Sequence, residues 1–152
     1  MAIAMTTGYS AQTEGALRCI EAASDWALAC VDALPQQSAY TLIDYGAADG
    51  GTAVGLWNSV LDRLHERQPQ AHYTLVGNDL PSNDNVALAA NVALQLSRPP
   101  SPTVLVSCRS FYEQVMAPGS VSFGFTATAM HWLSQSAGAL DGHTHVQASG
   151  ED

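Results

Sequence analysis

The chain has 152 residues, of which 47% are hydrophobic and 12% are charged. This composition is typical of one soluble globular domain that is long enough to bury a core. The 14 acidic residues outnumber the 5 Lys and Arg, which gives a formal net charge of −9. So acidic a chain has too few cations to displace counterions from a nucleic acid or to bind an anionic membrane surface.

The cysteines indicate a reducing compartment. Cys19, Cys30 and Cys108 form an odd set without CxxC spacing, which predicts reduced, mostly buried thiols and no zinc site or disulfide framework. The first ten residues contain no basic residue and no long apolar stretch, so no signal peptide is predicted. No apolar run approaches membrane-spanning length. We therefore expect a cytoplasmic protein without a metal.

The predicted elements alternate between helix and strand. A first helix is predicted from Gln12 or Thr13 to Leu34, with Thr13 as its cap. The predicted strands are Tyr40–Asp44, Tyr73–Asp79, Thr103–Ser107 and Ser120–Thr126. Helices are predicted over Thr52–Arg67 and Val86–Leu96, and a short helix or turn over Ser110–Met116. This order predicts an α/β fold with a mostly parallel sheet, preceded by a helix.

Residues 138–152 contain mainly Gly, Ser, His and acidic residues and almost nothing to bury. They predict a flexible tail after one domain of residues 1–137.

The stretch from Leu42 to Thr52 is typical of a strand, a loop and the start of a helix in a nucleotide-binding sheet. The apolar run ends at Asp44, and Gly46 begins a loop of small residues whose backbone a ligand can approach closely. The amides of the following helix suit an anionic group. Ala48 stands where a dinucleotide or P-loop fingerprint has glycine, so a tight turn without a ligand is the alternative interpretation.

Other polar and aromatic residues follow the predicted strands, where ligands bind in such sheets. Asp79 is placed to accept hydrogen bonds from ribose hydroxyls, or else to cap a turn. Ser110 and Phe111 suit the edge and face of an adenine, or else are a capping Ser and a core Phe. His131, next to a tryptophan, is either a pocket residue or a structural one. No nucleophile elbow or HExxH motif is present.

Together these segments resemble a known family. The sequences at Asp44–Thr52, Asn78–Asp84, Ser110–Tyr112 and His131–Gln135 occur in the order found in the SABATH carboxyl methyltransferases, the plant salicylate, jasmonate and xanthine-type enzymes and their microbial relatives. The most specific parts are Asn-Asp-Leu-Pro-x-Asn-Asp and Trp-Leu-Ser. The resemblance runs from about residue 9 to residue 135. It implies a Rossmann-like sheet that binds S-adenosylmethionine and methylates a small carboxylate or a ring nitrogen.

The resemblance also implies site residues. It assigns Trp132 to donate its indole N–H to the substrate carboxylate, and it places His131 in the same pocket. The cofactor residues that it implies are Thr13, Asp44 and Gly46 for the methionine part, Asp79 and Leu80 for the ribose, and Ser110 and Phe111 for the adenine. No catalytic base is implied, because a carboxylate acceptor is already ionised at neutral pH.

The chain departs from the family pattern at several positions. Ala16 aligns with the family's substrate-binding glutamine, Thr52 with an asparagine that touches the cofactor, and Thr128 with an aromatic residue common in the plant enzymes. Family members also continue through the rest of the sheet and a helical cap, so this chain matches an N-terminal half. An unpaired sheet edge and partly uncovered apolar faces are expected, as in a truncated form or a homodimer whose second copy covers the gap.

The predicted function is therefore methyl transfer from S-adenosylmethionine to a small carboxylic acid. Because the capping part is missing, a non-catalytic cofactor-binding or interaction module is the main alternative. A nicotinamide-dependent oxidoreductase is a third interpretation, which the missing third glycine disfavours.

Overall fold

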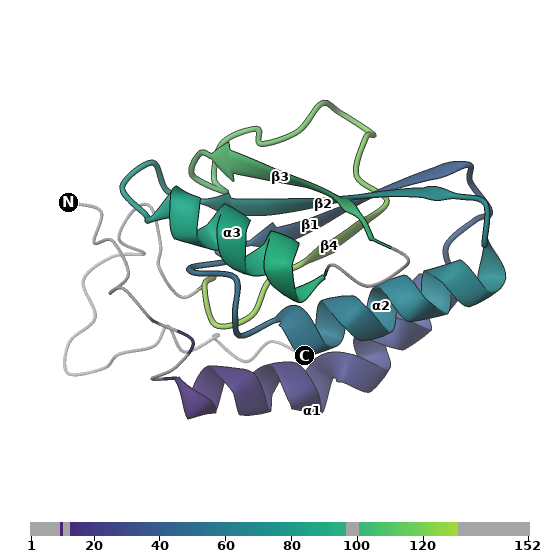
Figure 1. Cartoon of the computed structure of the whole chain (residues 1–152), viewed down its shortest axis with the longest axis horizontal. Helices are drawn as coiled ribbons and strands as arrows, with labels where there is room; N and C mark the ends of the chain where they lie inside the picture. The colour runs from purple at the N-terminus through teal and green to yellow at the C-terminus, as the bar shows by residue number, and fades with distance from the viewer. Residues whose placement is uncertain (1–9, 11–12, 97–100, 131–152) are drawn as a thin grey trace, which may run out of the picture.

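A computed structural model describes residues 10, 13–96 and 101–130 of the chain. Within them, helices and strands alternate up to residue 108, as the sequence predicts, and a further strand follows (Figure 1). The elements are α1 (Glu14–Asp32), β1 (Ala39–Tyr45), α2 (Val54–Arg67), β2 (His72–Asp79), α3 (Asn85–Gln95), β3 (Thr103–Cys108) and β4 (Phe123–Phe125).

The strands form one parallel sheet in the order β3-β2-β1-β4. β1 and β2 are central, and their registers align Asp44 with Gly77 and Tyr45 with Asn78. The carboxyl ends of both strands therefore lie at the same edge of the sheet. The predicted fold class, an incomplete Rossmann-like α/β sheet preceded by a helix, is confirmed.

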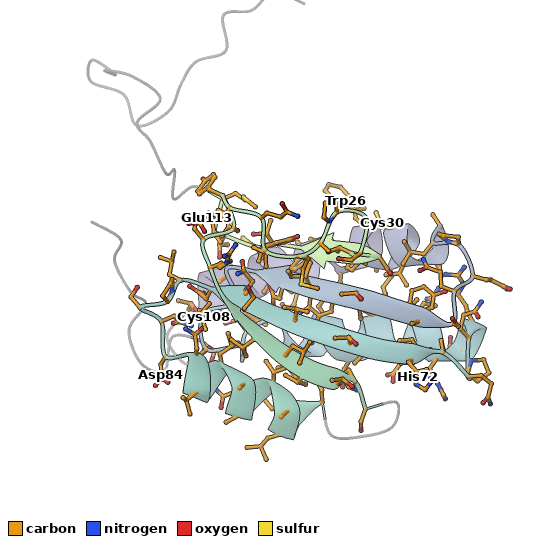
Figure 2. The ribbon with its side chains drawn as sticks, turned by 90° about the horizontal axis from the view of Figure 1, so that it is seen from above. Trp26, Cys30, His72, Asp84, Cys108 and Glu113 are labelled. Carbon is orange, nitrogen blue, oxygen red and sulfur yellow. The ribbon has the colours of Figure 1, made fainter. Side chains whose placement is uncertain are left out.

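The helices α1, α2 and α3 lie together on one face of the sheet (Figure 1). Alternate strand residues such as Leu42 and Leu75 meet apolar helix residues such as Leu64 and Leu88 in one buried core. In the described part of the chain no helix crosses the opposite face, which Figure 2 shows from above. Leu105 of β3 is half exposed there, in agreement with a sheet that is only partly covered.

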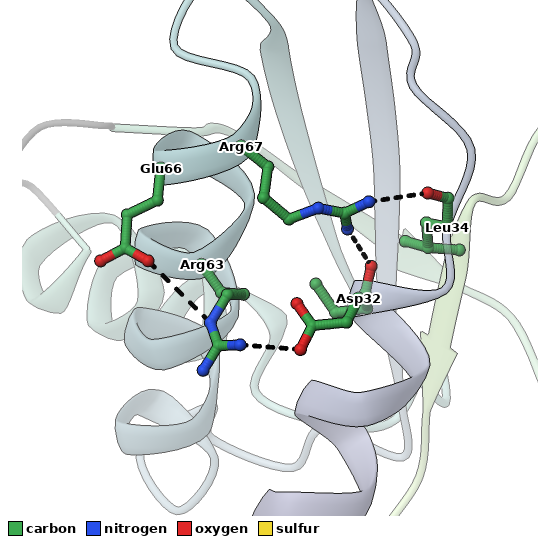
Figure 3. A network of polar contacts seen from close by, with 6 residues as sticks. Asp32, Leu34, Arg63, Glu66 and Arg67 are labelled. Atoms are coloured by element: carbon green, nitrogen blue, oxygen red, sulfur yellow. Dashed lines mark hydrogen bonds and ion pairs between the residues drawn. The ribbon is translucent and has the colours of Figure 1, made fainter.

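Polar contacts join the carboxyl ends of α1 and α2 (Figure 3). Arg67 of α2 donates to the backbone carbonyl groups of Val31 and Leu34, which lie at the end of α1. Arg63 forms an ion pair of 2.7 Å with Asp32. Arg67 therefore donates to one carbonyl in the last turn of α1 and to one just beyond the helix, which fixes the end of α1 against α2.

Some predicted details differ from the structure. β4 is shorter than the predicted strand from residue 120 to 126, and a turn that bonds the Ser120 N–H to the Ala117 carbonyl at 3.1 Å precedes it. The segment from residue 110 to 116 contains a turn, which is one of the two predicted forms. Thr13 precedes α1 without a side-chain capping bond. No helix in the described ranges is long and apolar enough to cross a membrane.

The prediction of mostly buried thiols is wrong, because Cys19, Cys30 and Cys108 are all exposed. α1 packs against α2 through another face, with Ile20, Ala27 and Val31 buried.

Candidate functional site

The carboxyl edge of the sheet joins the loop after β1 to the loop after β2. The Asp79 carboxylate accepts hydrogen bonds from the backbone N–H of Ala48 and from that of Leu80, both at 2.7 Å. The side-chain amide of Asn83 donates to the Ala48 carbonyl at 2.7 Å. Ala48 is therefore held at both its N–H and its carbonyl by the segment after β2.

These hydrogen bonds explain an unusual backbone conformation at Ala48. Ala48 has φ of 52°, in the left-handed region that residues other than glycine rarely adopt. The Asn91 side chain adds a bond of 2.9 Å to the Asp49 carbonyl, from the middle of α3. The loop after β1 is thus fixed by polar side chains that follow β2, and small residues alone do not define its shape.

Gly46 lies close to the segment after β4. Its φ is +75°, and a Cβ atom added there would lie 2.4 Å from Cβ of Ala129 and 3.7 Å from Cε1 of Phe111. A side chain would therefore collide with the segment after β4. The loop after β1, the turn after β3 and the segment after β4 meet at Gly46, as the strand-end rule predicts.

Asp44 is a buried carboxyl group at the end of β1. It is 7% exposed, and its Oδ2 accepts a hydrogen bond of 2.9 Å from the indole N–H of Trp57 in α2. Burial raises the pKa of Asp44 to about 6; the Trp57 bond lowers it, and the charge of Asp79 raises it. None of the ion pairs in the described ranges involves Asp44.

Two separate hollows flank the Gly46 loop. The first is narrow, with a cavity volume of about 30 Å³, and Asp44, Gly46, Ala48, Thr52 and Thr128 lie in its wall. Apolar residues complete this wall: Ala16 and Ile20 from α1, Phe125 from β4, and Ala47, Ala53, Ala127 and Ala129 from loops. The second hollow adjoins Phe111 and Tyr45 under the connection from β3 to β4. The two share no lining residue.

Asn78 positions the turn that carries the predicted adenine residues. Its side chain is fully buried and donates to the carbonyl groups of Ser107 and Arg109, at 3.0 and 2.8 Å. The turn that follows places the Phe111 ring 4.7 Å from that of Tyr112, centroid to centroid. The Ser110 hydroxyl accepts from the Tyr112 N–H at 3.3 Å.

The structure brings together several of the predicted cofactor residues but not all of them. Asp44 and Gly46 line the first hollow, Asp79 contacts its loop, and Phe111 lies beside Gly46. Thr13, Leu80 and Ser110 line neither hollow. The predicted acceptor residues His131 and Trp132 lie outside the described residues. No cluster of three or more potential metal ligands occurs among the residues that are described.

Sequence reasoning assigned no supporting role to the residues that hold this site together, although Asn78 and Asn83 belong to the motif Asn78–Asp84. Trp57 has the spacing of a core residue, but a buried indole N–H needs an acceptor, and that requirement could have directed attention to Asp44. Asn78, Asn83 and Asn91 are concentrated in and after β2. Such side chains bond readily to backbone groups, but their partners are distant in sequence.

Two curated proteins with similar sequences are methyltransferases. The methyltransferase LUC1 of Fusarium sp. is 31% identical over 111 residues, which cover 69% of this chain and 30% of that protein. The methyltransferase FUS9 of Gibberella moniliformis is 30% identical over 100 residues, which cover 60% and 26%. These relatives bear out the predicted resemblance to methyltransferases over this part of the chain. The chain spans about a third or less of the curated relatives that it matches.

A solved structure supports the fold. Loganic acid methyltransferase with SAH superposes with a TM-score of 0.71 at 16% identity, over 88% of this chain and 41% of that one. No family model matches the chain.

Proposed function

We propose that this chain binds S-adenosylmethionine and forms the cofactor-binding part of a methyltransferase. The observation that carries the proposal is the meeting of three strand-end segments at Gly46, beside a buried carboxyl group that has no cationic partner in the described ranges. The relatives named above are methyltransferases, and one of the similar structures was solved with SAH, S-adenosylhomocysteine. These findings favour the methyltransferase over the nicotinamide-dependent alternative.

The residues around the first hollow fit the amino-acid end of this cofactor. Asp44 offers a buried carboxylate for an ammonium group, which would offset the cost of burying its charge. Gly46 allows a ligand to come close to the backbone. The N-cap residue of α2, Ala53, provides no side-chain cap, so the first amides of α2 suit the ligand's carboxylate.

The adenosyl end would be held by Asp79, Leu80, Ser110 and Phe111. Asp79 already accepts one backbone bond at each oxygen, and an ionised carboxylate has lone pairs left for ribose hydroxyls. Phe111 presents an aromatic ring close to Gly46. These assignments, together with that of Thr13, follow from the sequence resemblance.

For the reaction, we propose a small carboxylic acid as acceptor and an O-methyl ester as product. The cofactor supplies a methyl group that is activated by the positive charge of its sulfonium. The protein then has to orient the acceptor oxygen and exclude water, and Trp132 and His131 are the residues proposed to hold the acceptor carboxylate. The name of the loganic acid methyltransferase supports an acid as acceptor.

A second candidate is a cofactor-binding or interaction module without turnover, alone or as a homodimer. The partial coverage of the relatives favours it, since 26 to 30% of their length matches here. Transfer of a radiolabelled methyl group to a panel of small carboxylic acids separates the two candidates. Turnover by the purified chain would exclude the module, and light scattering during gel filtration would give the oligomeric state.

Calorimetric titration with S-adenosylhomocysteine tests the cofactor proposal. We expect binding by the unmodified chain and a loss of at least about tenfold in Asp79→Ala and Phe111→Ala. Glu21→Ala, on the exposed surface of α1, and Ser82→Ala, exposed after β2, are the matched controls. Absence of binding at millimolar ligand, or equal losses in the controls, would contradict the proposal.

A further inference from the structure

Trp57 is almost fully buried, and its indole N–H donates to Asp44, the only buried carboxyl group among the described residues. The side chain is 2% exposed, and its indole N–H donates to Asp44 Oδ2 at 2.9 Å. A hydrogen bond to an ionised acceptor is stronger than one between neutral groups. The bond engages Oδ2 of Asp44 and leaves the other carboxylate oxygen without a hydrogen bond from Trp57.

The indole ring is fixed by neighbours from another element. Trp57 meets Phe123 and Phe125 of β4 edge-on, with ring centroids 6.1 and 6.3 Å apart. Phe125 is also the register partner of Asp44 in the sheet. β4 therefore pairs with the strand that carries Asp44 and also packs against the Trp57 ring. Rotation of the Trp57 ring would break this packing.

We propose that Trp57 is a positioning residue of the cofactor site, whose indole N–H holds Oδ2 of Asp44 so that the carboxylate presents its other oxygen to the ligand's ammonium group. This inference rests on the proposed function, because it needs a ligand with an amino-acid end. It assigns Trp57 no contact with the ligand.

The surroundings of Asp44 make the role measurable. Burial raises the pKa of Asp44 to about 6, with a lowering contribution from the Trp57 bond and a raising one from Asp79. Asp79, at the end of β2, is the charged group that acts on it. The residues that α1 and β4 contribute to the hollow, Ala16, Ile20 and Phe125, carry no titratable group. Loss of the indole N–H should therefore raise the pKa of Asp44 further.

The consequence for binding has a definite sign. An ammonium group binds the ionised form of Asp44, so affinity should fall as the pH drops through the pKa of this group. With the N–H removed, the fall should begin at a higher pH. A residue that only fills space would lower affinity equally at every pH.

The test compares Trp57→Phe with Phe123→Leu, which loosens the packing around the indole but leaves its N–H in place. Each protein is titrated calorimetrically with S-adenosylhomocysteine between pH 5.5 and 8.5. For Trp57→Phe we expect a loss of about threefold or less at pH 8.5 and about tenfold or more at pH 6.5, which corresponds to an upward shift of about one pH unit from a pKa near 6. Phe123→Leu should keep the midpoint of the unmodified chain.

A second ligand and a second variant remove ambiguity. 5′-Methylthioadenosine lacks the amino-acid end, so its affinity should be the same in Trp57→Phe and the unmodified chain at every pH. If Trp57→Phe does not fold, replacement of Trp57 by 3-benzothienylalanine removes the N–H and keeps the ring shape. A midpoint that is unchanged in the folded N–H-free variant would overturn the inference but leave the proposed function intact. Failure of the unmodified chain to bind S-adenosylhomocysteine would overturn both.

Discussion

The Asp79 carboxylate accepts a hydrogen bond from the Ala48 N–H at 2.7 Å, across 31 residues of the chain. The acid that ends β2 is therefore tied to the loop after β1. The two interpretations of Asp79, a turn residue and a ribose ligand, are compatible, because a carboxylate can accept several hydrogen bonds at once. Substitutions at this position should affect both the loop and the ligand.

Asp79→Asn should lower the pKa of Asp44. The change removes the negative charge that raises this pKa and keeps an oxygen that can accept from a backbone amide. Carbon-detected NMR titration of the Asp44 carboxyl group measures the effect without any ligand. Asp84→Asn, at the exposed start of α3, is the control and should leave the value near 6. An unchanged or higher pKa in Asp79→Asn would contradict the arrangement.

Asn83→Ala should weaken ligand binding by loosening the loop after β1. The change removes the bond to the Ala48 carbonyl, and loss of a partly exposed hydrogen bond costs about 1 kcal/mol of unfolding free energy. We expect the affinity for S-adenosylhomocysteine to fall about threefold to tenfold. Ser82→Ala, exposed in the same segment, should change both values little. Chemical denaturation measures the stability and calorimetry the affinity. Equal effects of the two variants would show that the Asn83 bond to the Ala48 carbonyl does not fix the loop.

Gly46→Ala should be severely harmful, whereas Gly55→Ala should be harmless. The new Cβ at Gly46 would collide with Ala129, and its φ of +75° is costly for alanine. A Cβ at Gly55 meets nothing within 4 Å and lies in α2, where alanine adds up to about 1 kcal/mol of stability. Thermal unfolding and S-adenosylhomocysteine titration measure the contrast. A fully stable, ligand-binding Gly46→Ala protein would show that the close approach is not needed.

Asp44→Asn should stabilise the free protein and abolish tight binding. The raised pKa means that the folded protein holds a proton more tightly than the unfolded chain does, so the cost of ionising Asp44 is fully present above about pH 6 and fades below pH 4. Asparagine can still accept from Trp57 and carries no charge. We expect a gain on the order of 1–3 kcal/mol at pH 8 that shrinks towards zero at pH 4. Chemical denaturation of the variant and the unmodified chain at pH 8 and pH 4 measures this gain. A variant that is less stable than the unmodified chain at pH 8 would contradict the prediction.

Much of the fold was predictable because the signals are local and strong. The apolar runs that end at Asp44 and Asp79 predict parallel strands, and the rule that ligands bind at the carboxyl ends of such strands brings their acids together. The glycine at position 46 is needed where the loop meets Ala129. These features depend on periodicity and topology, both of which a single sequence carries.

The supporting contacts were not predictable, because they depend on how elements pack. Trp57 and Asp44 are 13 residues apart, and only the angle of α2 across the sheet decides that the indole N–H reaches the carboxylate. Cys19 and Cys30 lie in an alanine-rich helix whose apolar residues occur on more than one face, so the sequence pattern does not reveal which face is buried.

The central claim is that the loops after β1, β2 and β3 form one binding site for an adenosyl ligand. Titration of ¹⁵N-labelled protein with S-adenosylhomocysteine, followed by amide NMR spectra, tests it most directly. We expect saturable shifts at residues 46–52, at Asp79 and Leu80, and at Ser110 and Phe111, with the far ends of the strands unaffected. Shifts confined to one of these loops, or no shift at millimolar ligand, would contradict it.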